Sequence, residues 1–212
     1  MGQQVRVWFA RTGAALPLSQ LNLRKSIRQA FFRSRLPVCN TVPGKSTLHF
    51  IAPLAVGVES NTECFDFEMP EAFFDPDAIF GALNGVMPAG LQAFAVAPVR
   101  HSATEITAVR YLLRLRAGAK SCATAEQLLR QMGALPREVT PGPLCSTTMY
   151  YQWIFQNIRS RMACLDLTVP RSYLAGFDPR KLFAAPGGGK APVNLLSVCR
   201  TQFLLPDGTV FE

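Results

Sequence analysis

Apolar and polar positions in the first part of the chain follow two different periods. VRVWFA (residues 5–10) and ECFDFEM (residues 63–69) are rich in valine and phenylalanine, and in the second segment the phenylalanines alternate with Asp66 and Glu68. A period of two predicts strands, with Asp66 and Glu68 on an exposed face. Between these segments, apolar residues recur at three- and four-residue spacing. That spacing predicts a helix from the N-cap Ser19 to about Arg35, ended by Leu36-Pro37.

Three further segments complete the pattern of the first hundred residues. LHFIAPLAVGVES (residues 48–60) predicts extended chain, and LQAFAVAPV (residues 91–99) predicts a strand. Asp75-Pro76 predicts the start of a second helix that reaches about Leu83, since Asp is a good N-cap and Pro suits the first helical position. The predicted order is β-α-β-β-α-β, which is typical of a ferredoxin-like fold.

The second half of the chain predicts the same order. FDFEMPEAFFDPDAIFGA (residues 65–82) is echoed by LDLTVPRSYLAGFDPRKLFAA (residues 165–185): a strand with an Asp, a closing Pro, then Asp-Pro at a helix start. We therefore predict an α+β chain of two tandem ferredoxin-like halves, residues 1–100 and 101–212, forming one compact unit. The other predicted elements are strands in 106–116, 147–158, 162–169 and 195–205, and helices in 124–132 and 178–185.

Charge is distributed unevenly along the chain, which carries a formal net charge of +8. Residues 1–58 contain eight basic residues and no acid, and residues 59–99 contain seven acids and no base. A basic surface attracts phosphate backbones and acidic proteins alike, so the charge indicates a polyanionic partner without naming one.

The first predicted helix has a basic side. Its core face comprises Leu23, Ile27, Ala30, Phe31 and Ser34. Arg24, Arg28 and Arg35 line another face, with Lys25 beside them. This face is either a solvated surface or a surface that contacts phosphates.

VPGKST (residues 42–47) resembles the end of a nucleotide-binding phosphate loop. That motif needs a glycine where this chain has Cys39, and it needs a strand before the loop and a helix after it. Here the helix comes first, so we do not expect a nucleotide site. Lys45 remains a candidate anion contact in the loop that follows the basic helix.

No catalytic or metal-binding constellation is visible. The six cysteines show no Cys-x-x-Cys spacing, and neither His49 nor His101 has an acid or a nucleophile at suggestive spacing. We therefore expect reduced thiols and a protein without cofactor or metal. The sequence lacks a signal peptide and an apolar stretch that could span a membrane, which favours the cytoplasm.

Two segments give the N-terminal third a distinctive pattern: RTGAALPLSQLNLRKSIRQAFFRSRLPV (residues 11–38) and APLAVGVES (residues 52–60). This pattern resembles an uncharacterised domain that accompanies radical S-adenosylmethionine (radical SAM) proteins in bacteria, often fused behind a cobalamin-binding radical enzyme. It implies a separately encoded radical SAM protein as a partner. The positions that match or occupy the family motifs are Gly13, Ser19, Gln20, Asn22, Arg33, Glu59 and Ser60, and Arg200 matches in the closing strand.

The chain departs from that family where chemistry would be expected. The family's Ser-His-x-Asp is here Ser19-Gln20-Leu21-Asn22, so two amides replace two groups that could titrate or bind a metal. The family's Gly-Phe-Asn-Pro-His-Pro loop is here TVPGKST, without histidine.

The order of elements is also similar to that of pseudouridine synthases, whose catalytic aspartate lies in the loop after the first helix. No Asp or Glu precedes Glu59 in this chain, so that nucleophile is absent. The sequence favours a noncatalytic accessory protein that binds RNA or another polyanion. Two alternatives stay open: a module that docks on a radical SAM enzyme, with aromatic anchors in MYYQWIF (residues 149–155), and a diverged enzyme or phosphate-ligand binder.

Overall fold

Two sets of antiparallel strands organise the chain in the computed structural model, which describes residues 2–39, 48–117, 150–157, 162–174, 177–183 and 193–211. The chain divides into two compact units, Met1–Ala103 and Thr104–Phe211. Each unit is built from strands and short helical segments, so the fold class is α+β. Lys45 and the expected helix in 124–132 lie outside the described residues.

The first unit has the strand order of a ferredoxin-like fold. Its elements are β1 (Gly2–Arg11), α1 (Gln20–Arg33), β2 (His49–Phe50), β3 (Glu59–Pro70), α2 (Pro76–Asn84) and β4 (Leu91–Pro98). The strands are arranged β4-β1-β3-β2, and every neighbouring pair is antiparallel. Single 3₁₀ turns, Gly13–Ala15 and Glu71–Phe73, precede the two helices.

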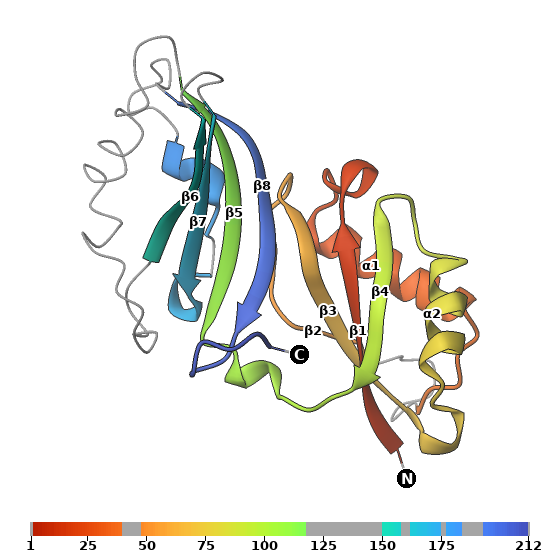
Figure 1. Ribbon diagram of the computed structural model, residues 1–212. Helices are drawn as coiled ribbons and strands as arrows, with labels where there is room; N and C mark the ends of the chain where they lie inside the picture. Colours follow the sequence, from red (N-terminus) through yellow and green to blue (C-terminus); the bar gives the residue numbers. More distant parts are fainter. Residues whose placement is uncertain are drawn as a thin grey trace. The chain divides into compact units, whose positions relative to one another are not determined.

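Both helices cover the same face of this sheet (Figure 1). Alternation in β1 turns Val5, Val7 and Phe9 toward the helices, as the sequence predicts. The ring of Phe31 on α1 packs edge-on against Phe67 of β3, with ring centroids 4.7 Å apart. The remaining buried members of this core come from α1 (Leu23, Ile27), α2 (Ile79, Leu83), β3 (Phe65, Met69) and β4 (Leu91, Ala93).

Side-chain caps begin the two helices where the sequence predicts them. The Ser19 hydroxyl accepts a hydrogen bond from the Asn22 N–H at 3.2 Å. The Asp75 carboxylate accepts from the N–H groups of Asp77 and Ala78 at 3.0 and 3.2 Å, and Pro76 is the first residue of α2. These bonds satisfy N–H groups that have no partner inside the helix.

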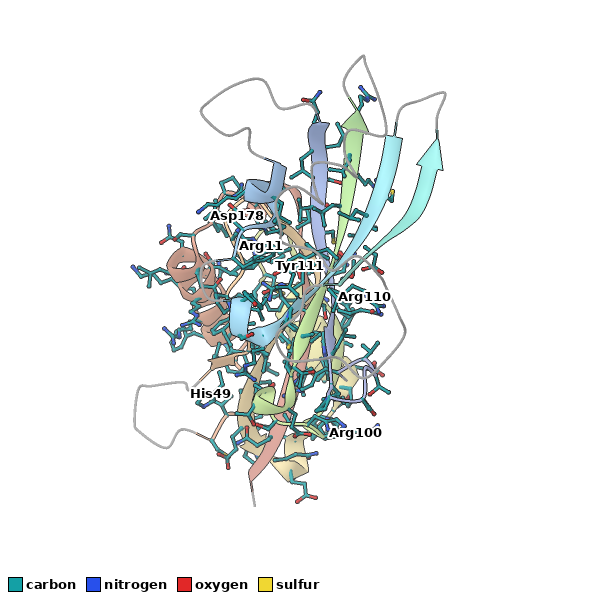
Figure 2. All side chains as sticks on the ribbon, turned by 90° about the vertical axis from the view of Figure 1, so that its left-hand side faces the viewer. Arg11, His49, Arg100, Arg110, Tyr111 and Asp178 are labelled. Atoms are coloured by element: carbon teal, nitrogen blue, oxygen red, sulfur yellow. The ribbon has the colours of Figure 1, made fainter. Side chains whose placement is uncertain are left out.

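The second unit repeats the strand order. Its strands are β5 (Ala108–Ala117), β6 (Tyr150–Asn157), β7 (Met162–Pro170) and β8 (Val193–Leu204), arranged β8-β5-β7-β6 with antiparallel neighbours. Neighbouring residues of β5 face opposite ways, so Tyr111 is buried while Arg110 is half-exposed (Figure 2). Further 3₁₀ helices are Ala103–Glu105, Arg171–Tyr173 and Pro179–Phe183.

The short helix expected in 178–185 is present as a 3₁₀ helix over Pro179–Phe183. Two other local predictions were wrong. In the run 48–60, only β2 and the first two residues of β3 are strand, because Pro53 cannot donate to a strand ladder and Gly57 adopts a left-handed φ of 81°. Asp66, expected on an exposed face, is largely covered and forms an ion pair with Arg6.

Candidate functional site

The basic residues of α1 lie on the side of the helix that turns away from the core. Lys25, Arg28 and Arg35 are exposed, whereas Arg24 is half-buried. Nitrogen-tipped side chains project from this helix at the left of Figure 2. We call Arg24, Lys25, Arg28 and Arg35 the basic stripe. The structure thus brings together all the predicted anion-binding residues except Lys45, whose position it does not describe.

Nothing in the described part of the chain neutralises the basic stripe. The ion pairs of Arg6 with Asp66, Arg110 with Asp166 and Arg180 with Asp178 all lie outside α1, and among the described residues none of the stripe's cations forms an ion pair. The first turn of α1 contains no acid. Like charges three or four residues apart on a helix repel, at a cost of about 0.2–0.5 kcal/mol per pair. The stripe therefore presents an uncompensated positive charge that a bound anion would stabilise.

The helix dipole accounts for only part of this pattern. Arg33 is in the last turn of α1 and Arg35 follows it, so both lie near the negative end of the dipole. Arg24 and Lys25 belong to the first half of the helix and Arg28 precedes its last turn, so the dipole gives these three cations no advantage. Their presence needs another explanation, either solubility or an anionic partner.

Two members of α1 are tied to neighbouring elements. The guanidinium carbon of Arg24 lies 5.4 Å from the ring centroid of Phe50 on β2, and the Arg24 Nε is buried without a hydrogen-bond partner. Arg33 donates from Nη2 to the Val86 carbonyl, at 2.9 Å, in the loop after α2. Arg33 therefore fixes the C-terminal end of the helix and contributes to its packing as well as to its charge.

The backbone after α1 makes an unusual turn. Arg35 adopts a left-handed conformation with a φ of 55°, a region in which glycine or asparagine usually ends a helix. The preceding residue, Ser34, is the C-cap, and its hydroxyl donates to the Phe31 carbonyl at 2.6 Å. The left-handed turn carries the Arg35 side chain out into solvent.

Most of the family-motif positions named from the sequence lie at the other end of α1. There β1 ends while β3 and β4 begin, because Arg11 pairs with both Ser60 and Leu91. The Leu16 carbonyl accepts from the Gly57 N–H at 2.8 Å, and the Gln20 Oε1 accepts from the Leu54 N–H at 3.4 Å. These bonds join the segment that contains Gly13, Ser19, Gln20 and Asn22 to the segment that contains Glu59 and Ser60.

The individual motif residues have structural roles at this corner. Gly13 has a φ of 45°, which a side chain would strain, and Ser19 caps α1. Gln20 holds the loop before β3 through its amide oxygen, and Asn22 supplies the N–H that Ser19 caps. Ser60 is buried, and its hydroxyl accepts from the Thr62 N–H at 3.2 Å. Glu59 is half-buried at the start of β3.

Arg11 organises the same corner and was missed by the sequence analysis. Its side chain is fully buried, and its guanidinium donates to three loop carbonyls: Ala15 at 3.2 Å, Leu16 at 2.9 Å and Leu18 at 2.6 Å (Figure 2). Charge-assisted bonds of this kind hold an otherwise irregular segment in one conformation. Arg11 thereby sets the position of Ser19 and the start of the basic helix.

Arg200 lies in the second unit, away from the other motif positions along the chain. It is a fully buried residue of β8. Its guanidinium carbon is 5.2 Å from the ring centroid of Phe203 and 6.0 Å from that of Tyr111. Within its unit, Arg200 therefore packs against aromatic rings.

The described residues contain no cluster of three or more His, Cys, Asp or Glu side chains that could hold a metal ion. In the same part of the chain, no helix is both long enough and apolar enough to cross a membrane.

Comparison with known sequences identifies the family. A family described as "Uncharacterized protein conserved in bacteria (DUF2344)" matches residues 4–138. The chain belongs to this family. The matched range includes α1 with its basic stripe, and also the motif positions at the start of α1 and of β3. No curated protein matches the chain.

Among solved structures, the "Crystal Structure of a Cbf5-Nop10-Gar1 Complex" contains a similar chain, with 12% sequence identity and a TM-score of 0.38. The match covers 95% of this chain and 58% of the other.

Proposed function

We propose that this DUF2344 protein is a noncatalytic accessory protein of radical SAM enzymes, acting in the cytoplasm, and that it binds RNA or another polyanion through the basic stripe of α1. One observation carries the proposal: the stripe has exposed cations on consecutive turns and no acidic partner among the described residues. Cations in this arrangement suit the phosphates of a nucleic-acid backbone.

The composition of the N-terminal region supports the same proposal. Residues 1–58 contain no Asp or Glu, so the sequence offers α1 no acidic neighbour in that region. In the sequence, Lys45 adds a further cation to this acid-free region after α1.

The proposal is tested by binding of a structured RNA to the full-length protein across a range of salt concentrations. The double variant Lys25→Gln/Arg28→Gln loses two proposed contacts. Each contact contributes roughly 0.7–0.9 to the slope of log K against log salt, so affinity at 0.1 M salt should fall about 10- to 50-fold and the slope should decrease.

The matched control is Arg114→Gln/Arg116→Gln, which removes the same charge from two exposed arginines of β5. It should change affinity much less. An equal loss in both double variants, or binding that does not depend on salt, would contradict the proposal.

A second candidate function is docking on a radical SAM protein through the surface around α2. The aromatic side chains of Phe73 and Phe80 are 60% and 38% exposed there, next to Glu71, Asp75 and Asp77. Exposed aromatic side chains are frequent anchors of protein interfaces. Co-purification of an iron–sulfur protein, lost in Phe73→Ser/Phe80→Ser and kept in Phe94→Ser, would support this candidate.

A further inference from the structure

Phe32 is the most exposed large apolar side chain in the described part of the chain. It is 85% exposed, although it lies in the last turn of a well-packed helix. Its neighbour Phe31 is buried and supplies the aromatic contacts to β3. Burying a phenylalanine side chain is strongly favourable, but single exposed apolar side chains are common on protein surfaces, so the surroundings of Phe32 decide what it indicates.

The setting of Phe32 is a shallow hollow of about 360 Å³ on the outer side of α1. Arg28, Gln29, Phe32 and Arg33 line it. Arg28 and Gln29 precede Phe32 by four and three residues, so they lie one turn away on the same side of the helix. Arg33 is held by its hydrogen bond to the Val86 carbonyl, which gives one wall of the hollow a fixed position.

The lining groups suit one kind of ligand. An aromatic ring offers a face for stacking, two guanidinium groups offer charge-assisted bonds to phosphate, and an amide offers both a donor and an acceptor to a base edge. A nucleobase with its adjoining phosphates has all the complementary groups. A base paired inside a duplex does not, because its faces are already stacked.

A protein partner fits this surface less well. The centre of a protein interface is usually a continuous, well-packed patch depleted of charge. Leu21 is the other exposed large apolar side chain of α1, and it is eleven residues from Phe32, or about 16 Å along the helix. The charged Lys25 and Arg28 lie between them.

We infer that this hollow binds an unpaired nucleobase of a single-stranded nucleic acid, stacked on Phe32, with the neighbouring phosphates at Arg28 and Arg33. The inference rests on the proposed polyanion binding by α1 and adds its ligand class: unpaired rather than duplex nucleic acid. The basic stripe supplies charge-dependent affinity, and Phe32 supplies a contact that does not depend on salt.

The test uses the full-length protein and short oligonucleotides that carry 2-aminopurine, whose fluorescence is quenched by stacking. Phe32→Leu should weaken binding of a single-stranded oligonucleotide roughly 10-fold, with the salt slope unchanged, and should reduce the quenching. Phe32→Tyr should keep the affinity and the quenching, because it keeps the aromatic ring. Leu21→Ala is the control for loss of an exposed apolar side chain and should have no effect.

Parallel measurements with RNA, DNA, a duplex and a mononucleotide identify the source of the base. The affinity for the duplex should not change in Phe32→Leu. Unchanged affinity and quenching in Phe32→Leu would overturn the inference, while loss of binding in Lys25→Gln/Arg28→Gln would still support the proposed function. Absence of any nucleic-acid binding at low salt would overturn both. Loss of a protein partner in Phe32→Leu, with oligonucleotide binding intact, would assign the side chain to a protein interface instead.

Discussion

The two units share an arginine on the first strand and an aspartate on the third, but they use the pair differently. In the first unit, the fully buried Arg6 donates from Nε and Nη2 to both carboxylate oxygens of Asp66, at 2.7 and 2.8 Å. In the second unit, the Arg110 Nε is 3.6 Å from the Asp166 Oδ1, and the Arg110 side chain is 39% exposed.

Strand register explains this difference. Arg6 and Asp66 are direct partners in the β1–β3 ladder. In the β5–β7 ladder, Arg110 is opposite Thr168, and Asp166 is opposite Leu112, so the ion pair is diagonal. Arg110 instead donates from Nη1 to Gln202 on β8, at 2.8 Å. A shift of two residues in the sequence thus converts a buried bidentate pair into a loose one.

The Asp-Pro segments that follow the third strands of the two units also use their aspartates differently. Asp75 uses its carboxylate to cap α2, which has nine residues. Asp178 accepts from the Arg180 N–H at 3.0 Å but is also bound by the Arg180 guanidinium, at 2.9 and 2.7 Å, and only a five-residue 3₁₀ helix follows. Similar sequences therefore give a cap in one unit and a local ion pair in the other.

The largest difference between the units is expected from removal of the two arginines. Arg6→Met leaves the Asp66 carboxylate largely buried without its partner and should lower the free energy of unfolding by about 3 kcal/mol. Arg110→Met should cost less than about 1 kcal/mol, because its pair is partly exposed. Chemical denaturation followed by circular dichroism measures both.

The double variant Arg6→Met/Asp66→Leu is the control for the buried pair. It removes both charges and should recover a large part of the lost stability. Equal losses in Arg6→Met and Arg110→Met would show that register does not separate the two pairs.

Loss of the Asp75 cap and loss of the Asp178 ion pair should have smaller and unequal effects. Asp75→Ala should cost about 1 kcal/mol, because two N–H groups at the start of α2 lose their acceptor. Asp178→Ala should lower the free energy of unfolding by only about 0.3 kcal/mol, because an exposed local ion pair contributes little. Faster amide hydrogen exchange at Asp77 and Ala78 in Asp75→Ala would confirm the cause, and equal losses in the two variants would contradict it.

The smallest effects concern the titration of two carboxyl groups in the second unit. Burial raises the pKa of Asp166 above its usual value of 3.8, and Arg110 only partly opposes this. The hydrogen bond from Arg180 lowers the pKa of Asp178 below the same value. Carbon-13 NMR of the carboxyl groups should therefore give a midpoint above 3.8 for Asp166 and below 3.8 for Asp178.

The two groups change stability in opposite directions with pH. Asp166 binds its proton more tightly in the folded state, so its contribution to stability increases as pH falls from above its folded pKa toward 3.8. The contribution of Asp178 is fully present above 3.8 and is lost as pH falls through its lowered folded pKa. Arg180→Gln should move the Asp178 midpoint upward and leave that of Asp166 in place. An Asp166 midpoint below 3.8 would contradict the first assignment, and an Asp178 midpoint above 3.8 would contradict the second.

Local signals in the sequence were sufficient to predict most of the helices and strands. Ser19, Asp75 and Pro76 determine helix starts through bonds to nearby residues, and alternation places β1 and β3. The run 48–60 was misassigned because its apolar composition favours strands, whereas Pro53 and Gly57 interrupt the ladder. Both residues are visible in the sequence, and each is a local signal against a continuous strand.

The buried charges could not be located from the sequence. Arg6 and Arg11 belong to a strand, but their partners are an aspartate sixty residues later and a set of loop carbonyls. Such contacts depend on the tertiary structure. The basic stripe was predicted because helical spacing alone places Arg24, Arg28 and Arg35 on one side. Phe32 was missed although the sequence has a signal for it: of two adjacent phenylalanines in a helix, only one can face the core.

The left-handed turn at Arg35 also bears on how variants of this protein would be selected for stability. A residue with a side chain loses about 1–2 kcal/mol in this conformation, a loss that glycine avoids. A stability screen would therefore favour Arg35→Gly, whereas a screen for polyanion binding would favour the arginine. Position 35 is a point at which the best-folding chain and the best-binding chain differ by one residue.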